Sequence, residues 1–377
     1  MPGISTIFRL FPGFRVFTTA GMLALLAAGA FSDGLAMAQT APRKVVIAAG
    51  TQVINSAYPY LMMPLALGYW KQEGLDVEVV AAGGSAQAIQ QMVGKNADFV
   101  EINSSSMIQA VSQTGVPLRA VAANTTVDWS LVSLKGGPIK ALGDFKGRSI
   151  GISNLGSGGL PLLKAYLRTG GLDPDKDVTI QPVGFGGMAL DALKAGRVDG
   201  LMFWASAVVS FESAGANLTY FRAPEWSTYA DYSLATLAGT LNADSAMVEA
   251  VVRGMAKASL FTATNPDCAR KLFWKSFPAM KASGNMDDAA KAAFDLKQIQ
   301  SGADSMKEAR TLGGGTLWAN APVAGYAGMQ KFMIDNKVIT KEVPAASLVV
   351  SDPAFFERAN TFDHEKIRQE ALSCAGV

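Results

Sequence analysis

The sequence has very little histidine and cysteine. His364 is the only histidine among the 377 residues, and Cys268 and Cys374 are the only cysteines. Catalysis by Ser/His/Asp or Cys/His groups and most zinc sites need a well-placed imidazole, so a single histidine near the C-terminus argues against a hydrolase. Two cysteines cannot form a four-thiolate site, and their spacing is not that of a C-x-x-C pair. The sequence therefore predicts neither a metal nor another cofactor.

The sequence also lacks an excess of either charge. Lys and Arg number 33 and Asp and Glu 31, which gives a formal net charge of +2, and no block of five or six like charges occurs. Proteins that hold nucleic acid or anionic lipid by bulk electrostatics need such an excess, so we expect neither partner. Hydrophobic residues make up 49% of the chain. That composition is typical of a globular protein, and at roughly 100–200 residues per domain it allows two or three domains.

Only one apolar run suggests targeting. Arg9 and Arg15 precede the apolar stretch 16–31, and an A-M-A triplet ending at Ala38 follows it. The run is short for a bilayer span, and basic residues, an apolar stretch and a small-residue triplet follow one another as in a secretory signal peptide. We therefore predict a signal peptide over residues 1–38, cleaved after Ala38, and a mature periplasmic protein that begins at Gln39 without a membrane anchor.

Export to an oxidising compartment would allow the two cysteines to form a disulfide. A Cys268–Cys374 disulfide would tie the C-terminal tail to a helix that begins near Asn265. The sequence does not give the distance between them, so two free thiols remain the alternative.

Apolar runs alternate with helical patterns over the first two thirds of the chain. This alternation predicts an α/β protein with mostly parallel sheets flanked by helices. In a first block we expect strands over 45–48, 77–80, 99–102 and 118–121 and helices over 59–71, 85–94 and 105–113. In a second block we expect strands over 149–152, 178–180 and 200–203 and helices over 160–169 and 188–195.

The two blocks resemble each other, which predicts two similar lobes. After the run 232–237 the pattern becomes helical, over 244–262, 266–274, 287–299 and 323–336. No low-complexity linker separates the blocks. We therefore expect one lobe to be inserted into the other through two short crossovers near 124–129 and 229–233. The first lobe would comprise residues 39–128 and 232–377, and the second 129–231.

Several motifs in sequence order resemble one family. Pro64–Glu78 reads PLALGYWKQEGLDVE, Ile139–Arg148 reads IKALGDFKGR, Ile150–Ser157 reads IGISNLGS and Ala192–Asp199 reads ALKAGRVD. Together these motifs resemble periplasmic substrate-binding proteins of the nitrate/sulfonate/taurine and thiamine-precursor type, over roughly residues 44–265. The resemblance implies a two-lobed periplasmic-binding-protein fold of type II that closes on a small molecule. It further implies a monomer that delivers this ligand to the permease and ATPase of an ABC importer.

Four turns are placed to line a cleft between the lobes. In open α/β sheets ligands bind outside the carboxyl ends of the strands, where helix N-termini expose unpaired N–H groups. Ser and Gly before a helix also serve as plain caps, so each turn has a purely structural alternative. The candidate residues in these turns are Gly84, Ser85, Ser104, Ser105, Gly156, Ser157 and Gly187.

Other candidates are aromatic or polar side chains at the lobe boundary. Asn55 and Tyr58 follow the first strand, Trp129 lies at the first crossover, and Trp204 follows the strand that ends at residue 203. The tryptophans could stack on a ligand or only pack. Phe185 and Met188 are expected in the core rather than in contact with ligand.

The sequence predicts a binding protein rather than an enzyme. Its ligand would be a small organic anion or an aromatic or sulfonate-like molecule. Two alternatives stay open: a protein that presents its ligand to a sensory receptor, and an enzyme on the same scaffold. Thiamine-pyrimidine synthases share this fold, but as a family they use pyridoxal phosphate, an active-site histidine and a cysteine-rich motif. This chain lacks the cysteine-rich motif and has its only histidine at position 364.

Overall fold

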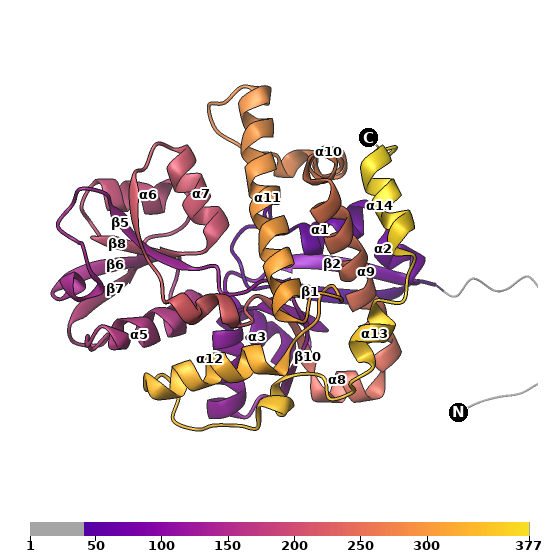
Figure 1. Ribbon diagram of the computed structural model, residues 1–377, viewed down its shortest axis with the longest axis horizontal. Helices are drawn as coiled ribbons and strands as arrows, with labels where there is room; N and C mark the ends of the chain where they lie inside the picture. The colour runs from indigo at the N-terminus through magenta and orange to yellow at the C-terminus, as the bar shows by residue number, and fades with distance from the viewer. Residues whose placement is uncertain (1–40, 377) are drawn as a thin grey trace, which may run out of the picture. The chain divides into compact units, whose positions relative to one another are not determined.

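The computed structural model describes residues 41–376. The predicted signal peptide, its cleavage site after Ala38 and the predicted mature N-terminus at Gln39 lie outside the described residues. Residues 41–376 form two five-stranded sheets flanked by helices, and we call the parts built around them the first and the second lobe (Figure 1).

The first sheet contains the four strands expected in the first block and the run after residue 232. Its order is β2-β1-β3-β10-β4, with bounds Leu75–Ala81, Arg43–Ala49, Phe99–Ile102, Ser233–Leu237 and Leu118–Ala123. β1 pairs in parallel with β2 and β3, whereas β10 is antiparallel to β3 and β4. The sheet is thus mostly parallel, with one antiparallel strand supplied by the returning chain.

The second sheet has the same pattern. Its order is β7-β6-β8-β5-β9, with bounds Val178–Pro182, Arg148–Ile152, Gly200–Phe203, Ser130–Leu134 and Leu218–Phe221. β6 pairs in parallel with β7 and β8, and β5 is antiparallel to β8 and β9. The sequence analysis expected β6, β7 and β8 but missed β5 and β9. In each sheet the antiparallel strand is the one that follows a crossover between the lobes.

The two crossovers lie side by side. The backbone N–H of Val127 donates to Tyr229 O at 3.1 Å, and that of Asp231 donates to Thr125 O at 2.9 Å. An antiparallel bridge joins Thr126 to Ala230. The connection between the lobes is therefore a short two-stranded ribbon. The exact lobe boundaries, 39–128 with 232–377 and 129–231, stay a prediction.

Helices of the first block differ from expectation at one point. The expected helix over 59–71 is two helices, α1 (Pro59–Ala66) and α2 (Tyr69–Gln72). Gly68 separates them with a left-handed φ of 69°, a conformation that glycine adopts without steric cost. α3 (Ser85–Val93) and α4 (Ser104–Gln109) match the expected helices, and α4 continues as a π-turn over Ala110–Thr114.

Three helices cover the second sheet. α5 (Gly159–Thr169) and α6 (Gly187–Lys194) were expected, whereas α7 (Ala205–Ser213) was not. Short 3-10 turns occur at Leu142–Phe145 and Pro224–Thr228 in this part of the chain.

The C-terminal third is helical, as expected. Its helices are α8 (Ala238–Ala243), α9 (Ser245–Thr264), α10 (Pro266–Ser276), α11 (Asp288–Leu312), α12 (Val323–Asp335), α13 (Phe355–Ala359) and α14 (His364–Ser373). Short 3-10 turns follow at Pro278–Met280 and Ala345–Leu348. α9 packs on α1 and α2, where the buried Trp70 donates from Nε1 to Val251 O at 2.9 Å.

α11 extends further than the expected helix over 287–299 and contacts both lobes. It packs on α9 of the first lobe and on α7 of the second, and in Figure 1 it stands between the two. Gln298 of α11 donates from Nε2 to Ser206 O and to Ser210 Oγ, both at 3.1 Å. α11 is therefore a second bridge between the lobes.

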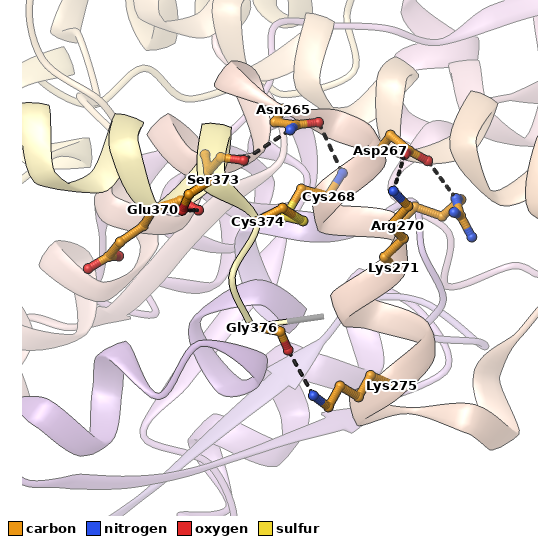
Figure 2. Close-up of a disulfide and its surroundings, with 11 residues drawn as sticks. Asn265, Asp267, Cys268, Arg270, Lys271, Lys275, Glu370, Ser373, Cys374 and Gly376 are labelled. Atoms are coloured by element: carbon orange, nitrogen blue, oxygen red, sulfur yellow. Dashed lines mark hydrogen bonds and ion pairs between the residues drawn. A yellow bond between two sulfur atoms is a disulfide. The ribbon is translucent and has the colours of Figure 1, made fainter.

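A disulfide joins Cys268 of α10 to Cys374 at the end of α14, with their Cα atoms 5.7 Å apart. Figure 2 shows how the surrounding side chains hold the same junction. Asn265 accepts from the Cys268 N–H at 3.0 Å and donates to Ala371 O at 2.9 Å, and Lys275 donates to Gly376 O at 2.8 Å. The C-terminal tail is thus fixed to the first lobe.

Candidate functional site

One pocket lies where the carboxyl ends of strands from both sheets meet. The loops after β1, β2 and β3 line it from the first lobe, and those after β6, β7 and β8 from the second. Both crossovers and the middle of α11 complete the lining. Its empty volume is about 690 Å³, including space open to solvent.

Five of the predicted site residues line this pocket, namely Tyr58, Gly84, Trp129, Ser157 and Trp204. Six do not, namely Asn55, Ser85, Ser104, Ser105, Gly156 and Gly187. A role of any of them in ligand binding stays a prediction.

The polar groups of the six residues outside the lining are largely used within the protein. Ser104 Oγ donates to Ala230 O at 2.7 Å, and Ser85 Oγ donates to Asn103 Oδ1 at 3.2 Å. Asn55 Oδ1 accepts from the Ala57 N–H at 3.0 Å. Gly187 begins α6 on an exposed turn. Ser85 and Ser104 therefore bond neighbouring segments of the protein, and neither is a capping residue of its helix.

Ser105 and Gly156 instead take part in contacts between the lobes. Ser105 Oγ donates to Gly158 O at 2.8 Å, and Gly156 O accepts from the Ala86 N–H at 3.2 Å. Asn154 Nδ2 adds a bond to Gly83 O at 2.9 Å. These bonds cross directly from one lobe to the other, so the lobes contact each other beside the pocket as well as at the crossovers.

A hydrogen-bonded carboxyl group lies at the edge of the pocket. Asp231 accepts from Asn103 Nδ2 at 2.9 Å through one oxygen and from the Ser104 N–H at 3.0 Å through the other. Burial raises the pKa of Asp231 to about 7, although these hydrogen bonds oppose the rise. Asp231 thus anchors the second crossover to the start of α4.

A second carboxyl group, Asp128, lines the pocket from the first crossover. Burial raises the pKa of Asp128 to about 7, while the positive charge of Arg222 and backbone N–H groups lower it. Arg222 itself is exposed and donates to Val127 O at 3.0 Å. Sequence reasoning considered Trp129 and overlooked its neighbour. A carboxylate beside an aromatic residue in a crossover was the signal that could have identified Asp128.

Beneath these groups, Glu101 is fully buried in β3. It accepts from Asn124 Nδ2 at 2.8 Å through Oε1, and no described residue bonds its Oε2. Burial raises the pKa of Glu101 well above its usual range, while the hydrogen bond from Asn124 lowers it.

Aromatic rings form a group in each lobe. In the second lobe, Trp204 stacks on Phe185 with ring centroids 5.6 Å apart and meets Trp129 edge-on at 5.5 Å. In the first lobe, Tyr58 lies 6.2 Å from Tyr60 and 5.9 Å from Tyr232.

All six of these rings line the pocket. The expectation for Phe185 was therefore wrong, since it contributes to the lining. The expectation for Met188 was also wrong, because its side chain is 64% exposed. Both residues follow β7 at the carboxyl end of the sheet, where apolar side chains face the pocket or solvent instead of the core.

α11 contributes Ser301, Gly302 and Ser305 to the lining, which sequence reasoning missed. Gly302 allows α11 to approach the start of α1, because a Cβ atom there would lie 2.9 Å from Pro59 Cδ. His364 lies outside the pocket and stacks on Phe362 at 4.3 Å. Over residues 41–376, no group of three or more His, Cys, Asp or Glu side chains is placed to hold a metal ion, and no helix is long and apolar enough to cross a membrane.

Two α/β lobes, joined by paired crossovers and enclosing one pocket, define the periplasmic-binding-protein fold. The sequence model of the NMT1/THI5-like family matches residues 58–269, more than half of the chain, and the chain belongs to this family. The resemblance inferred from the motifs is thereby confirmed. No curated protein matches the sequence.

Solved structures with this fold come from proteins of different function. A protein from Bordetella bronchiseptica RB50 has a TM-score of 0.64 and 21% identity, with 89% of this chain and 99% of that chain covered. The periplasmic aliphatic sulphonate binding protein SsuA from Escherichia coli has a TM-score of 0.56 and 15% identity, with 82% and 92% covered. A mutant of DSZB in complex with biphenyl-2-sulfinic acid has a TM-score of 0.53 and 14% identity, with 84% and 99% covered. At these identities the likeness shows a shared fold.

Proposed function

We propose that this protein is the solute-binding component of an ABC importer and works in the periplasm. The observation that carries the proposal is the pocket lined by strand-end loops of both lobes. A ligand held there contacts both lobes and stabilises their closed arrangement, which is the form that an importer can distinguish from the empty protein.

The connection between the lobes supports closure as the binding motion. Only the paired crossovers join the lobes covalently, and both of them line the pocket. A few dihedral changes in such a ribbon suffice to open the lobes. We therefore infer that the crossovers are the hinge and that the protein binds as a monomer before it delivers its ligand to the permease and its ATPase.

The sequence and the relatives support the same assignment. The predicted signal peptide would export the chain, and the similar protein from Escherichia coli is a periplasmic binding protein for aliphatic sulphonates. The six aromatic rings of the lining favour an aromatic or otherwise apolar organic solute within the predicted ligand classes.

An enzyme on this scaffold is the second candidate, because DSZB is described as a desulfurization enzyme. Among the described residues, the lining contains no histidine, cysteine or lysine. Cys268 and Cys374 are joined to each other away from the pocket. The lining therefore offers carboxyl and hydroxyl groups for hydrogen bonds, and it favours binding over nucleophilic chemistry.

A thermal-unfolding screen tests the proposal. Residues 39–377 are unfolded and refolded with the disulfide intact, to remove carried-over ligand, and are melted with nitrate, sulfonates, carboxylates, amines and pyrimidines. A ligand at about one hundred times its Kd adds roughly 2.7 kcal/mol of stability, which raises the Tm by several degrees. We expect stabilisation by one chemical class and recovery of the compound unchanged. Conversion of the compound would favour the enzyme, and a panel without any stabilising compound would contradict the proposal.

Genetics separates import from sensing. If the protein feeds an importer, deletion of its gene abolishes uptake of the stabilising compound. Intact uptake with loss of a behavioural or transcriptional response to that compound would support ligand presentation to a receptor instead.

A further inference from the structure

At three helix starts beside this pocket, one N–H group already has an acceptor within the protein. At α3, the Ala86 N–H donates to Gly156 O, and at α4, the Ser104 N–H donates to Asp231 Oδ1. At α5, the Gly159 N–H is 3.3 Å from Ser157 Oγ. Helix N-termini attract anions through free N–H groups, so these three contacts reduce the attraction that is left for an anionic ligand.

The ionisable groups that line the pocket are carboxyl groups, which carry the same negative charge as an anionic ligand. Asp128 and Asp231 are both in the lining, and none of the described lining residues is Lys, Arg or His. Asp231 is bonded to the side chain of Asn103 and to Ser104, whereas no described side chain donates a hydrogen bond to the Asp128 carboxyl group, which meets backbone N–H groups of Asp128 and Ala205. Asp128 therefore keeps more of its accepting capacity for a ligand than Asp231 does.

Aromatic rings of both lobes line the same pocket as this carboxyl group. Trp129 follows Asp128 directly and packs on Trp204, while Tyr232 lies on the neighbouring crossover. The Tyr232 hydroxyl is buried without a partner among the described residues. Aromatic faces attract cations through their quadrupoles, most strongly at desolvated sites.

From this combination we infer that the pocket binds an organic cation, a protonated or quaternary amine, with Asp128 as its counter-charge and the aromatic rings of both lobes around it. The inference rests on the proposed function, because it specifies the solute that the binding protein captures. It also favours the aromatic part of the expected ligand class over the anionic part. An anion would face two carboxyl groups without a compensating cation in the lining, and each contact would add to the cost of desolvation.

The ionisation of Asp128 gives this inference a pH dependence. With a pKa of about 7, Asp128 is about nine tenths ionised at pH 8 and about one tenth at pH 6. A cation that requires the charged form thus loses about tenfold in affinity over this interval. The charged and titratable groups that interact with Asp128 are Arg222, Glu308, Asp231, Tyr58, Tyr60 and Tyr232.

Probes matched in size and different in charge test the inference. Isothermal titration at pH 8 compares aryl and alkyl trimethylammonium ions with the corresponding alcohols and sulfonates, for example benzyltrimethylammonium, benzyl alcohol and benzenesulfonate. We expect the cations to bind at least tenfold more tightly than their neutral counterparts. Asp128→Asn should lower cation affinity at least tenfold and weaken its pH dependence, leaving only the part that Asp231 contributes. The matched control, Asp191→Asn on the exposed side of α6, should change neither.

Each of the other outcomes contradicts a stated part of the inference. Tighter binding of alcohols or sulfonates than of the matched cations would overturn the cation inference and leave the proposed function intact. Unchanged cation affinity in Asp128→Asn would overturn the role of Asp128. Failure of every probe, from protein shown to be folded, would count against both the inference and the proposed function.

Discussion

The carboxyl groups of Asp128 and Asp231 are removed from water in the folded protein, and this burial controls their ionisation. An ordinary aspartate in an unfolded chain has a pKa near 4. In the folded protein burial raises the pKa of both residues to about 7, so the folded state holds protons that the unfolded state releases between pH 4 and 7. Each group therefore favours folding fully below pH 4, and that contribution is lost as the pH rises to about 7.

This linkage predicts the effect of Asp128→Asn on stability. Because the amide cannot ionise, the ligand-free variant should become more stable relative to wild type as the pH increases from 5 to 7.5. At about 1.4 kcal/mol per pKa unit, the difference between these two pH values should amount to as much as about 3 kcal/mol. Urea unfolding at both values measures it. A difference that does not depend on pH would show that Asp128 ionises normally in the folded protein.

At the scale of elements, glycines at helix starts decide how closely the lobes approach. Gly158 precedes α5 with helical backbone angles, φ −63° and ψ −19°, so alanine would fit its conformation. A Cβ atom at this position, however, would lie 2.5 Å from Asn103 Cβ in the other lobe. That atom is not at the end of a flexible side chain, so the lobes must move apart to accept it.

Gly158→Ala should therefore impair closure while leaving each lobe folded. We expect affinity for a ligand found in the screen to fall at least tenfold, with circular dichroism unchanged. Gly187→Ala is the matched control, because it also lies at a helix start and its Cβ atom would meet nothing within 4 Å. Equal affinities of the two variants would show that ligand binding does not require the lobe contact seen at Gly158.

The elements also show which parts of the fold the sequence could predict. Strands flanked by turn residues and followed by a helix were found, as for β1 and β6, because their apolar runs are regular. β5 and β9 were missed since SLVSL and LTYF are short and mixed with hydroxyl residues. α11 was predicted too short, because beyond residue 299 its buried positions include Gly302 and Ser305, which carry no apolar signal.

The site was predictable to the same limited extent. Sequence order placed strand-end turns and crossovers near the cleft, and Tyr58, Trp129 and Trp204 do line the pocket. Sequence could not distinguish a serine that faces a ligand from one that bonds the other lobe, as Ser105 does with Gly158. That distinction depends on how the lobes close, which is a contact between residues far apart in the chain.

At the scale of the whole molecule, the first lobe carries almost all of the C-terminal helices and the second lobe is comparatively small. The long α9 packs on α1, α2 and α14, and the disulfide fixes the end of α14 to α10. In the proposed hinge motion, the first lobe with these cross-links is the fixed half of the pocket, and the second lobe moves about the crossovers. We therefore expect the disulfide to serve the stability of the first lobe and not the binding step itself.

Removal of both cysteines tests this division. The Cys268→Ala/Cys374→Ala variant should lose about 2–5 kcal/mol in free energy of unfolding, because the bridge closes a loop between residues 106 apart and thereby restricts the unfolded chain. Its ligand affinity should equal that of wild type, since neither cysteine lines the pocket. Urea unfolding and ligand titration measure the two quantities.

A reductant distinguishes loss of the bridge from loss of packing. It should lower the stability of wild type and leave the double variant unchanged. Wild-type protein whose stability is insensitive to reductant would argue against a stabilising bridge. Weakened ligand binding by the double variant would show that the disulfide also affects the pocket.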